Sequence, residues 1–248
     1  MHIRGAIHAH STLSHDGTMP VGELIAFYAQ KGYQFLGISE HAEDMDEEKV
    51  STLVEQCAIH TTPYFCAIPG LEFVCRNGIH ITGIGVTRLI QEKDPAAAAL
   101  EMRRQGGFAV LAHPKRIGWR CPENVLRAVS AAEIWNVGYD GKFVPPVEAL
   151  SSFARMKHAN PDLLAIAGHD LHKKPAFYDV ALEMDVESLS RQPILENLRE
   201  GRYAIRSPLF RSGPQFRVST AKAASVRLLG WPIRNARKAR SFFLRWSA

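Results

Sequence analysis

Short apolar runs alternate with longer amphipathic stretches over the first 200 residues of the chain. This alternation is typical of βα units and a parallel sheet, so the pattern predicts an α/β fold. The predicted strands cover residues 3–8, 35–39, 65–73, 80–86, 108–112, 131–135 and 163–168. The predicted helices cover residues 21–31, 46–60, 95–105, 122–130, 146–159 and 188–199. Residues 180–184 are predicted as a further strand or as a loop over the site.

Side chains that can bind a metal or a polar ligand follow nearly every apolar run. They are His8, His10, His41, Glu72, His113, Asn136, His169, Asp170 and His172. Successive side chains of a strand point to opposite faces, so His8 and His10 share a face, and paired imidazoles suit borderline ions such as Zn. If the runs are parallel strands of one barrel, their C-terminal ends meet at one face, where α/β barrels carry active sites.

Composition and charge narrow the class of protein. The chain has 248 residues, 46% of them hydrophobic, which is enough for one or two domains. Its four cysteines form no C-x-x-C pair and no signal-like segment precedes them, so we expect reduced thiols in a cytoplasmic protein. No apolar run approaches the roughly 18 residues of a membrane span. The sequence does not predict an oligomeric state.

The charge is divided between the body and the tail. Residues 201–248 contain eleven Lys or Arg and no Asp or Glu, so this part carries +11 and the first 200 residues carry −6. We expect residues 208–248 to form a basic, partly helical extension. Three interpretations are open for it: a terminal helix packed on the body, attraction of nucleic acid, or contact with an anionic membrane surface or a protein partner.

The ordered motifs resemble those of one known family. They are "HAHSTLSHDG", "SEH", "PGLEF", "GIHITGIG", "AHPKR", "EIWN" and "GHDLH". Over residues 2–175 the set is similar to the PHP (polymerase and histidinol phosphatase) family. The resemblance implies a distorted (βα)7 TIM-like barrel over residues 1–207, with two to three divalent metals (Zn, Mn or Fe) at the C-terminal ends of the strands. It also implies hydrolysis of phosphate esters.

The resemblance further implies which residues hold each metal. A first metal would take His8, His10, Glu72 and Asp170. A second would share Glu72 and add His80 and His113. A third would take Asp16, His41 and His172. His15 competes with Asp16 for the third position, because the family carries this ligand five or six residues after the second His; we predict Asp16.

Other residues are candidates for contacts with the substrate. Arg116 and Lys115 follow His113 directly, and a guanidinium matches phosphate oxygens in a bidentate geometry, so Arg116 is the first choice for the phosphate. Asn136 could bond to the substrate or to a metal ligand, or it could have a structural role and hold the strand end. His15 and His169 are candidate proton donors to the leaving group, although His169 could instead cap its strand. With them, Asp170, His172 and Arg116 complete the predicted catalytic set.

The leading functional prediction is a metal-dependent phosphomonoesterase acting on a small soluble phosphate, such as a nucleotide or a sugar phosphate. The first alternative is a phosphodiesterase or exonuclease, with the basic tail attracting nucleic acid. The second alternative is a metal-binding scaffold without catalysis.

Overall fold

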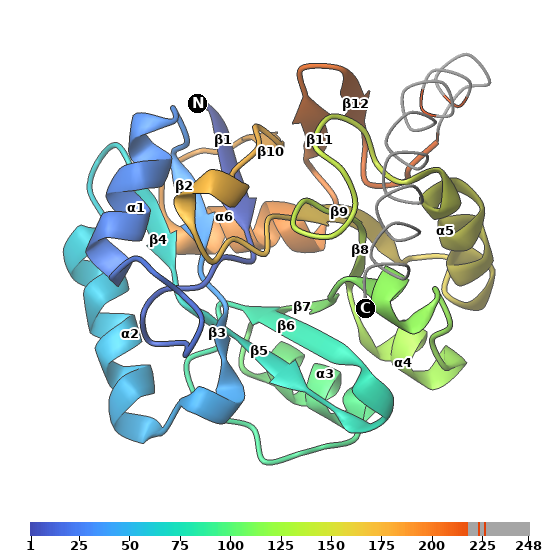
Figure 1. Ribbon diagram of the computed structural model, residues 1–248, viewed down its shortest axis with the longest axis horizontal. Coiled ribbons are helices and arrows are strands. Elements are labelled where there is room, and N and C mark those ends of the chain that lie inside the picture. Colours follow the sequence, from blue (N-terminus) through green and yellow to red (C-terminus); the bar gives the residue numbers. More distant parts are fainter. Residues whose placement is uncertain (218–222, 224–225, 227–248) are drawn as a thin grey trace, which may run out of the picture.

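A computed structural model describes residues 1–217, 223 and 226, and its strands form two mixed six-stranded sheets (Figure 1). The first sheet has the order β12 (Phe210–Ser212), β11 (Ala204–Ser207), β10 (Ala181–Asp185), β1 (His2–Ile7), β2 (Phe35–Gly37) and β4 (Cys66–Ile68). The second has the order β3 (Glu40–His41), β5 (Gly70–Val74), β6 (His80–Ile84), β7 (Phe108–Leu111), β8 (Ala131–Asn136) and β9 (Leu164–Gly168). The predicted α/β fold is confirmed.

Six α-helices are present in the described part of the chain. They are α1 (Val21–Gln30), α2 (Glu47–His60), α3 (Pro95–Arg104), α4 (Glu123–Ala128), α5 (Val147–Ala159) and α6 (Arg191–Arg199). Short 3-10 turns occur at η1 (Ala42–Asp44), η2 (Arg76–Gly78), η3 (Pro114–Ile117) and η4 (Lys174–Ala176). In Figure 1, α1 and α2 lie side by side at one flank of the strands and α4 and α5 at the other. None of these helices is long and apolar enough to cross a membrane.

The helix starts have local causes. The side chain of Asp46 accepts a hydrogen bond from the Lys49 amide at the start of α2, and Asp94 caps α3 in the same way through Ala97. Pro95 is the first residue of α3, where its missing N–H costs nothing. All six predicted helices are therefore found, and α6 begins three residues later than the predicted start at residue 188.

One predicted strand ends early and another is divided in the structure. The strand predicted at residues 35–39 ends at Gly37 as β2 and is followed by β3, which was not predicted, and residues 65–73 are split into β4 and β5 at Pro69. At each break the chain leaves the first sheet and enters the second, since β2 pairs with β4 while β3 pairs with β5. A Cβ at Gly70 would lie 2.5 Å from the Gly83 carbonyl oxygen, so only glycine permits this crossing.

The sequence pattern predicted a parallel sheet, but both sheets of the structure are mixed. β6 runs antiparallel to β5 and β7, and β10 runs antiparallel to β1, which makes residues 181–185 a strand and not a loop. The reversal of β6 has a consequence for His80, because this first residue of β6 pairs with Val74, the last residue of β5. His80 therefore reaches the edge at which the parallel strands end.

The paired strands of the described chain do not close into one barrel, which corrects the expected (βα)7 TIM-like barrel. β9 meets β1 only where both strands end: the His169 amide, just after β9, donates to the carbonyl of Ile7, the last residue of β1, at 3.0 Å, and Ala9 bridges Leu171. The backbone leaves the extended conformation at this junction, with φ of 64° at His8 and 51° at Asp170, so a regular ladder cannot continue.

The predicted boundary at residue 207 falls inside the hairpin of β11 and β12, whose strands pair across it. Most of the predicted basic extension, namely residues 218–222, 224–225 and 227–248, lies outside the described residues. The four cysteines are free, in line with the predicted thiols, and all but Cys121 are buried.

Candidate metal centre

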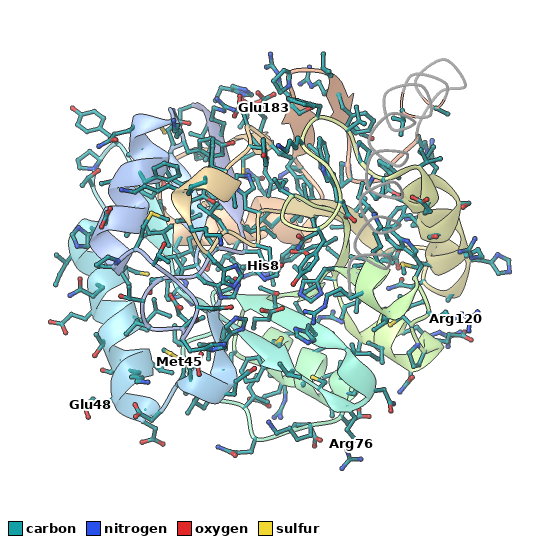
Figure 2. The ribbon with its side chains drawn as sticks, viewed as in Figure 1. His8, Met45, Glu48, Arg76, Arg120 and Glu183 are labelled. Carbon is teal, nitrogen blue, oxygen red and sulfur yellow. The ribbon has the colours of Figure 1, made fainter. Side chains whose placement is uncertain are left out.

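Three of the predicted metal ligands have a left-handed backbone. His8, His113 and Asp170 have φ of 64°, 28° and 51°, and each follows the end of a strand, namely β1, β7 and β9. Residues other than glycine rarely adopt this backbone conformation, and those that do are often found at functional sites. In Figure 2 the label of His8 lies near the middle of the molecule, where these strand ends converge.

The carboxylate of Glu72 is the centre of the cluster and is almost completely buried. Its shortest contacts to histidine ring nitrogens are His113 at 2.8 Å, His80 at 3.0 Å, His41 at 3.2 Å, His8 at 3.5 Å and His10 at 3.7 Å. These five histidines come from four separate segments of the sequence, since His8 and His10 are two residues apart. Glu72 therefore has the position that a bridging carboxylate between neighbouring cations requires.

Asp170 is the second carboxylate beside His8 and His10. Its Oδ1 atom lies 3.5 Å from His8 Nε2, 3.4 Å from His10 Nε2 and 3.7 Å from His172 Nδ1. Because Glu72 and Asp170 both approach the Nε2 atoms of His8 and His10, a cation among them would have ligands from β5 and from the segments that follow β1 and β9.

Asp16 joins the cluster at its outer edge, and His15 does not. The Asp16 carboxylate lies 3.3 Å from His41 Nε2 and 3.2 Å from His172 Nε2. The exposed His15 ring instead points its Nδ1 atom at Asp44, at 2.7 Å. This hydrogen bond and the charge of Asp44 raise the pKa of His15. Of the two alternatives for the third position, the geometry favours Asp16.

The donor atoms fit divalent metals. Four groups have one ligand atom from each member within 4.8 Å of the others. These are His10, His41 and His172; His8, His10 and Glu72; His8, His113 and Asp170; and Glu72, His80 and His113. Both ring nitrogens of His10, Nε2 of His8 and Nε2 of His172 are buried and form no hydrogen bond. Buried polar atoms are rarely left unpaired, and an imidazole lone pair is a common metal ligand.

The local charges keep the carboxylates ionised. Burial alone would raise the pKa of Glu72 and Asp170, but the histidines around them outweigh it and hold both pKa values below the ordinary range. Burial lowers the pKa of His10 to about 4, so this ring is neutral at pH 7. A neutral imidazole beside ionised carboxylates is the state in which both groups bind a metal.

Two buried glutamates beside the cluster were not predicted from the sequence. Glu133 of β8 contacts the His8 ring, and Glu40 of β3 accepts hydrogen bonds from the Ser11 amide and from Ser14 Oγ. Ser14 Oγ in turn accepts from the His41 amide at 2.9 Å. The signal was present in "SEH" and "AAEIWN", since a glutamate within an apolar run must find a partner when it is buried.

Asn136 contacts a predicted ligand. Its side-chain amide donates to Glu133 at 3.0 Å and to Asp170 Oδ2 at 3.3 Å, and it is fully buried. Of the roles predicted for Asn136, the geometry favours the contact with a metal ligand over a contact with the substrate, and its bonds to Tyr139 and Asp140 are in line with the structural role at the strand end.

Arg116 and Lys115 differ in their surroundings. Lys115 Nζ lies 3.0 Å from the buried carboxylate of Asp140. Arg116 stacks on Tyr139, with its guanidinium carbon 5.3 Å from the ring centre, and the Tyr139 ring lies 5.5 Å from that of His113. Arg116 is therefore the better placed of the two to contact a phosphate beside the histidines.

His169 lies outside the cluster. Its Nδ1 atom is 2.7 Å from the Tyr28 hydroxyl, and its Nε2 atom is 2.5 Å from the Val180 carbonyl oxygen. Both ring nitrogens are thus engaged in the buried interior, which favours the capping alternative over proton donation.

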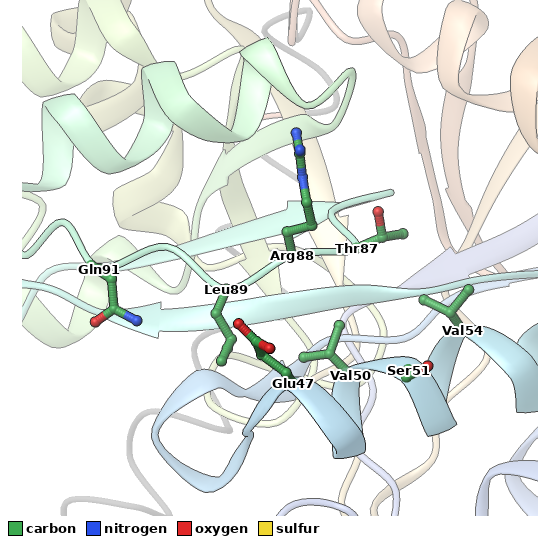
Figure 3. A pocket seen from close by; sticks show the side chains of 8 residues that line it. All are labelled: Glu47, Val50, Ser51, Val54, Thr87, Arg88, Leu89 and Gln91. Atoms are coloured by element: carbon green, nitrogen blue, oxygen red, sulfur yellow. The ribbon is translucent and has the colours of Figure 1, made fainter.

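The groove shown in Figure 3 is separate from this site. It has a volume of about 690 Å³ and lies between α2, through Glu47 and Val50, and the segment after β6, through Arg88 and Leu89. None of the predicted site residues lines it.

Comparisons with known proteins find relatives by structure only. No family model matches the chain, and no curated protein sequence matches it. Among solved structures, the chain shares its fold with proteins described as PHP-like or metal-dependent phosphoesterases, among others. The resemblance inferred from the motifs is therefore confirmed at the level of the fold.

The particular structures are distant in sequence. A two-domain protein containing a predicted PHP-like metal-dependent phosphoesterase from Bacteroides vulgatus has a TM-score of 0.59 at 18% identity, covering 83% of this chain and 65% of its own. PsfC from Pseudomonas syringae has a TM-score of 0.58 at 14% identity, covering 95% and 98%. The lesion-specific endonuclease EndoQ from Pyrococcus furiosus has a TM-score of 0.53 at 13% identity, covering 81% and 56%.

Proposed function

We propose that this chain is a divalent-metal-dependent hydrolase of phosphate esters, and that it acts as a phosphomonoesterase on a small phosphate. The observation that carries the proposal is the convergence of buried histidine nitrogens without hydrogen bonds on two ionised carboxylates. The fold shared with PHP-like metal-dependent phosphoesterases supports it.

The proposed ligands form three sets. His8, His10, Glu72 and Asp170 would hold one metal; Glu72, His80 and His113 a second; and Asp16, His41 and His172 a third. Clustered dications lower the pKa of water and stabilise negative charge on phosphoryl oxygens, which is the chemistry that phosphate-ester hydrolysis needs. The metals that suit imidazole and carboxylate ligands include Zn, Mn and Fe.

The other residues of the site would bind and orient the substrate. Arg116 would contact the phosphate oxygens, since its guanidinium lies over Tyr139 beside His113. His15 would be the proton donor to the leaving oxygen, because its ring lies 5.5 Å from that of His41 and its contact with Asp44 favours the protonated form.

Tyr139 favours a substrate with a flat ring. It is 44% exposed, although it contacts both His113 and Arg116. A partly exposed aromatic side chain beside the proposed phosphate position can contact a nucleobase by stacking, a contact worth roughly 1–3 kcal/mol. Between the two substrate classes predicted from the sequence, this supports a nucleotide over a sugar phosphate.

A phosphodiesterase or nuclease is the second candidate. It is supported by the structural similarity to an endonuclease and by the excess of basic residues after residue 200. The two candidates differ in their products, since a monoesterase releases inorganic phosphate and a nuclease releases nucleotides from an oligonucleotide.

The test combines metal analysis with a product assay. We expect the purified protein to contain about two to three divalent ions per chain and to release phosphate from nucleoside monophosphates. Glu72→Gln should lose metal and activity, whereas Glu183→Gln, a change of a buried carboxylate on β10, should retain both. Metal binding without hydrolysis of any phosphate ester would favour the scaffold alternative, and absence of metal binding would refute the proposal.

A further inference from the structure

The carboxylate of Glu133 connects two of the proposed metal ligands. It is fully buried in β8, and its Oε1 atom lies 2.6 Å from Nδ1 of His8. Its Oε2 atom accepts hydrogen bonds from the His113 amide at 2.8 Å and from the Asn136 side chain at 3.0 Å. One acidic side chain thus joins β8 to the ends of β1 and β7, and through Asn136 it reaches Asp170.

The contact with His8 selects a ring nitrogen. A carboxylate only accepts hydrogen bonds, so a His8 ring that binds a metal, and is therefore neutral, would carry its proton on Nδ1. The Nε2 lone pair is then the free one, and this atom lies 3.5 Å from both Glu72 and Asp170. Glu133 therefore directs the correct nitrogen of His8 towards the metal position.

The contact with His113 holds a strained backbone. His113 has φ of 28°, and its amide donates to the side chain of Glu133 rather than to a backbone carbonyl of a neighbouring strand. A conformation of this kind costs roughly 1–3 kcal/mol and persists only where the surroundings fix it.

An irregularity in the pairing of β8 with β9 and the lack of a side chain at Gly168 determine where the Glu133 carboxylate lies. The ladder between β8 and β9 shifts register between Glu133 and Trp135, and such irregularities redirect side chains beside functional sites. On β9, a Cβ on Gly168, which pairs with Asn136 just after this shift, would lie 1.9 Å from Oε1 of Glu133. The absence of a side chain at residue 168 therefore makes room for the carboxylate.

We propose that Glu133 is a positioning residue that orients His8 and His113, the ligands of two different metals, before any metal binds. The inference rests on the proposed metal-dependent function and deepens it. Loss of such a hydrogen-bond partner typically lowers metal affinity by about 10–100-fold. A Gln side chain cannot replace it, because Gln has only one acceptor oxygen. Its NH2 group would face another donor, either the His8 ring N–H or the His113 amide N–H.

The test measures zinc affinity by competition with a chromophoric chelator, independently of catalysis. Glu133→Gln and Gly168→Ala should each weaken zinc binding by about 10-fold or more and should alter the visible spectrum of the cobalt-substituted protein. The matched control Glu183→Gln should change neither. Glu183 is also a buried strand carboxylate, bonded to Arg206, and its label lies at the far edge from His8 in Figure 2.

A double-mutant cycle separates positioning from a general loss of folding. In a His172→Ala background the loss caused by Glu133→Gln should persist within about twofold, whereas in a His8→Ala background it should shrink by at least about threefold. Equal losses in the two backgrounds, or zinc binding of Glu133→Gln equal to that of Glu183→Gln, would overturn the inference while the proposed function stands. A wild-type protein that binds no zinc would overturn both.

Discussion

The buried pair of Tyr28 and His169 allows a quantitative test of whether His169 is structural. The Val180 carbonyl can only accept, so Nε2 of His169 donates to it and Nδ1 is left as an acceptor. Burial lowers the pKa of His169 to about 4 and raises that of Tyr28, so the ring is neutral and the phenol keeps its proton. The Tyr28 hydroxyl therefore donates to Nδ1 at 2.7 Å.

Replacement of Tyr28 by Phe removes one atom and leaves a buried acceptor without a partner. The cost of such a group is about 1–3 kcal/mol. For a domain of this size each kcal/mol shifts the melting temperature by about 2–4 °C, so we expect Tyr28→Phe to lower it by about 2–12 °C.

The assay is thermal unfolding at neutral pH, followed by circular dichroism, with the metal content of both proteins matched. Tyr64→Phe is the control, because Tyr64 is 83% exposed and its hydroxyl should contribute almost nothing. A melting temperature of Tyr28→Phe equal to that of Tyr64→Phe would refute the assigned tautomer and the structural role of His169.

Three further predictions concern metal, substrate and thiols. A metal at a free concentration of 100 times its Kd should stabilise the native protein by about 2.7 kcal/mol, so its removal by a chelator should lower the melting temperature by about 5–11 °C. Equal melting temperatures with and without the chelator would exclude a metal site in the native state. Arg116→Lys should raise KM for the phosphate substrate about 10-fold with little change in kcat, whereas Lys115→Gln should leave KM nearly unchanged; the reverse order would assign the phosphate contact to Lys115. Burial raises the pKa of every cysteine to about 11 or 12, so at pH 8 the thiolate fraction falls from about one in ten to about one in a thousand or less. Native protein should react slowly with a disulfide reagent, faster as pH rises, and fully once unfolded; rapid reaction before unfolding would contradict this.

The positions of the helices and most strands follow from local sequence patterns. Hydrophobic periodicity, proline at helix starts and acidic N-caps are properties of neighbouring residues, so they can be read along the chain. The direction of β6 is different in kind. Its apolar run has the same pattern whether it lies parallel or antiparallel to its neighbours, and only the short connection through Arg76–Gly78 favours the reversal.

More of the candidate site than of the sheet topology could be predicted from the sequence, and the reason is physical. Histidine and carboxylate residues are costly to bury, so their recurrence at the ends of apolar runs is a signal that survives errors in strand direction. His80 is the exception: it begins its apolar run and was predicted only through the family resemblance, and the antiparallel pairing with Val74 brings it to the same edge.

The residues that support the ligands were missed because their roles depend on tertiary contacts. Nothing in the sequence around Glu133 states that Gly168, 35 residues later, leaves space for its carboxylate, or that His113 will need an acceptor for a strained amide. A buried carboxyl group is tolerated only if hydrogen-bond donors converge on it, and here two of those donors, the His8 ring and the His113 amide, belong to the proposed ligands. The same hydrogen bonds that make Glu133 tolerable in the interior therefore orient two ligands of the proposed metal centre.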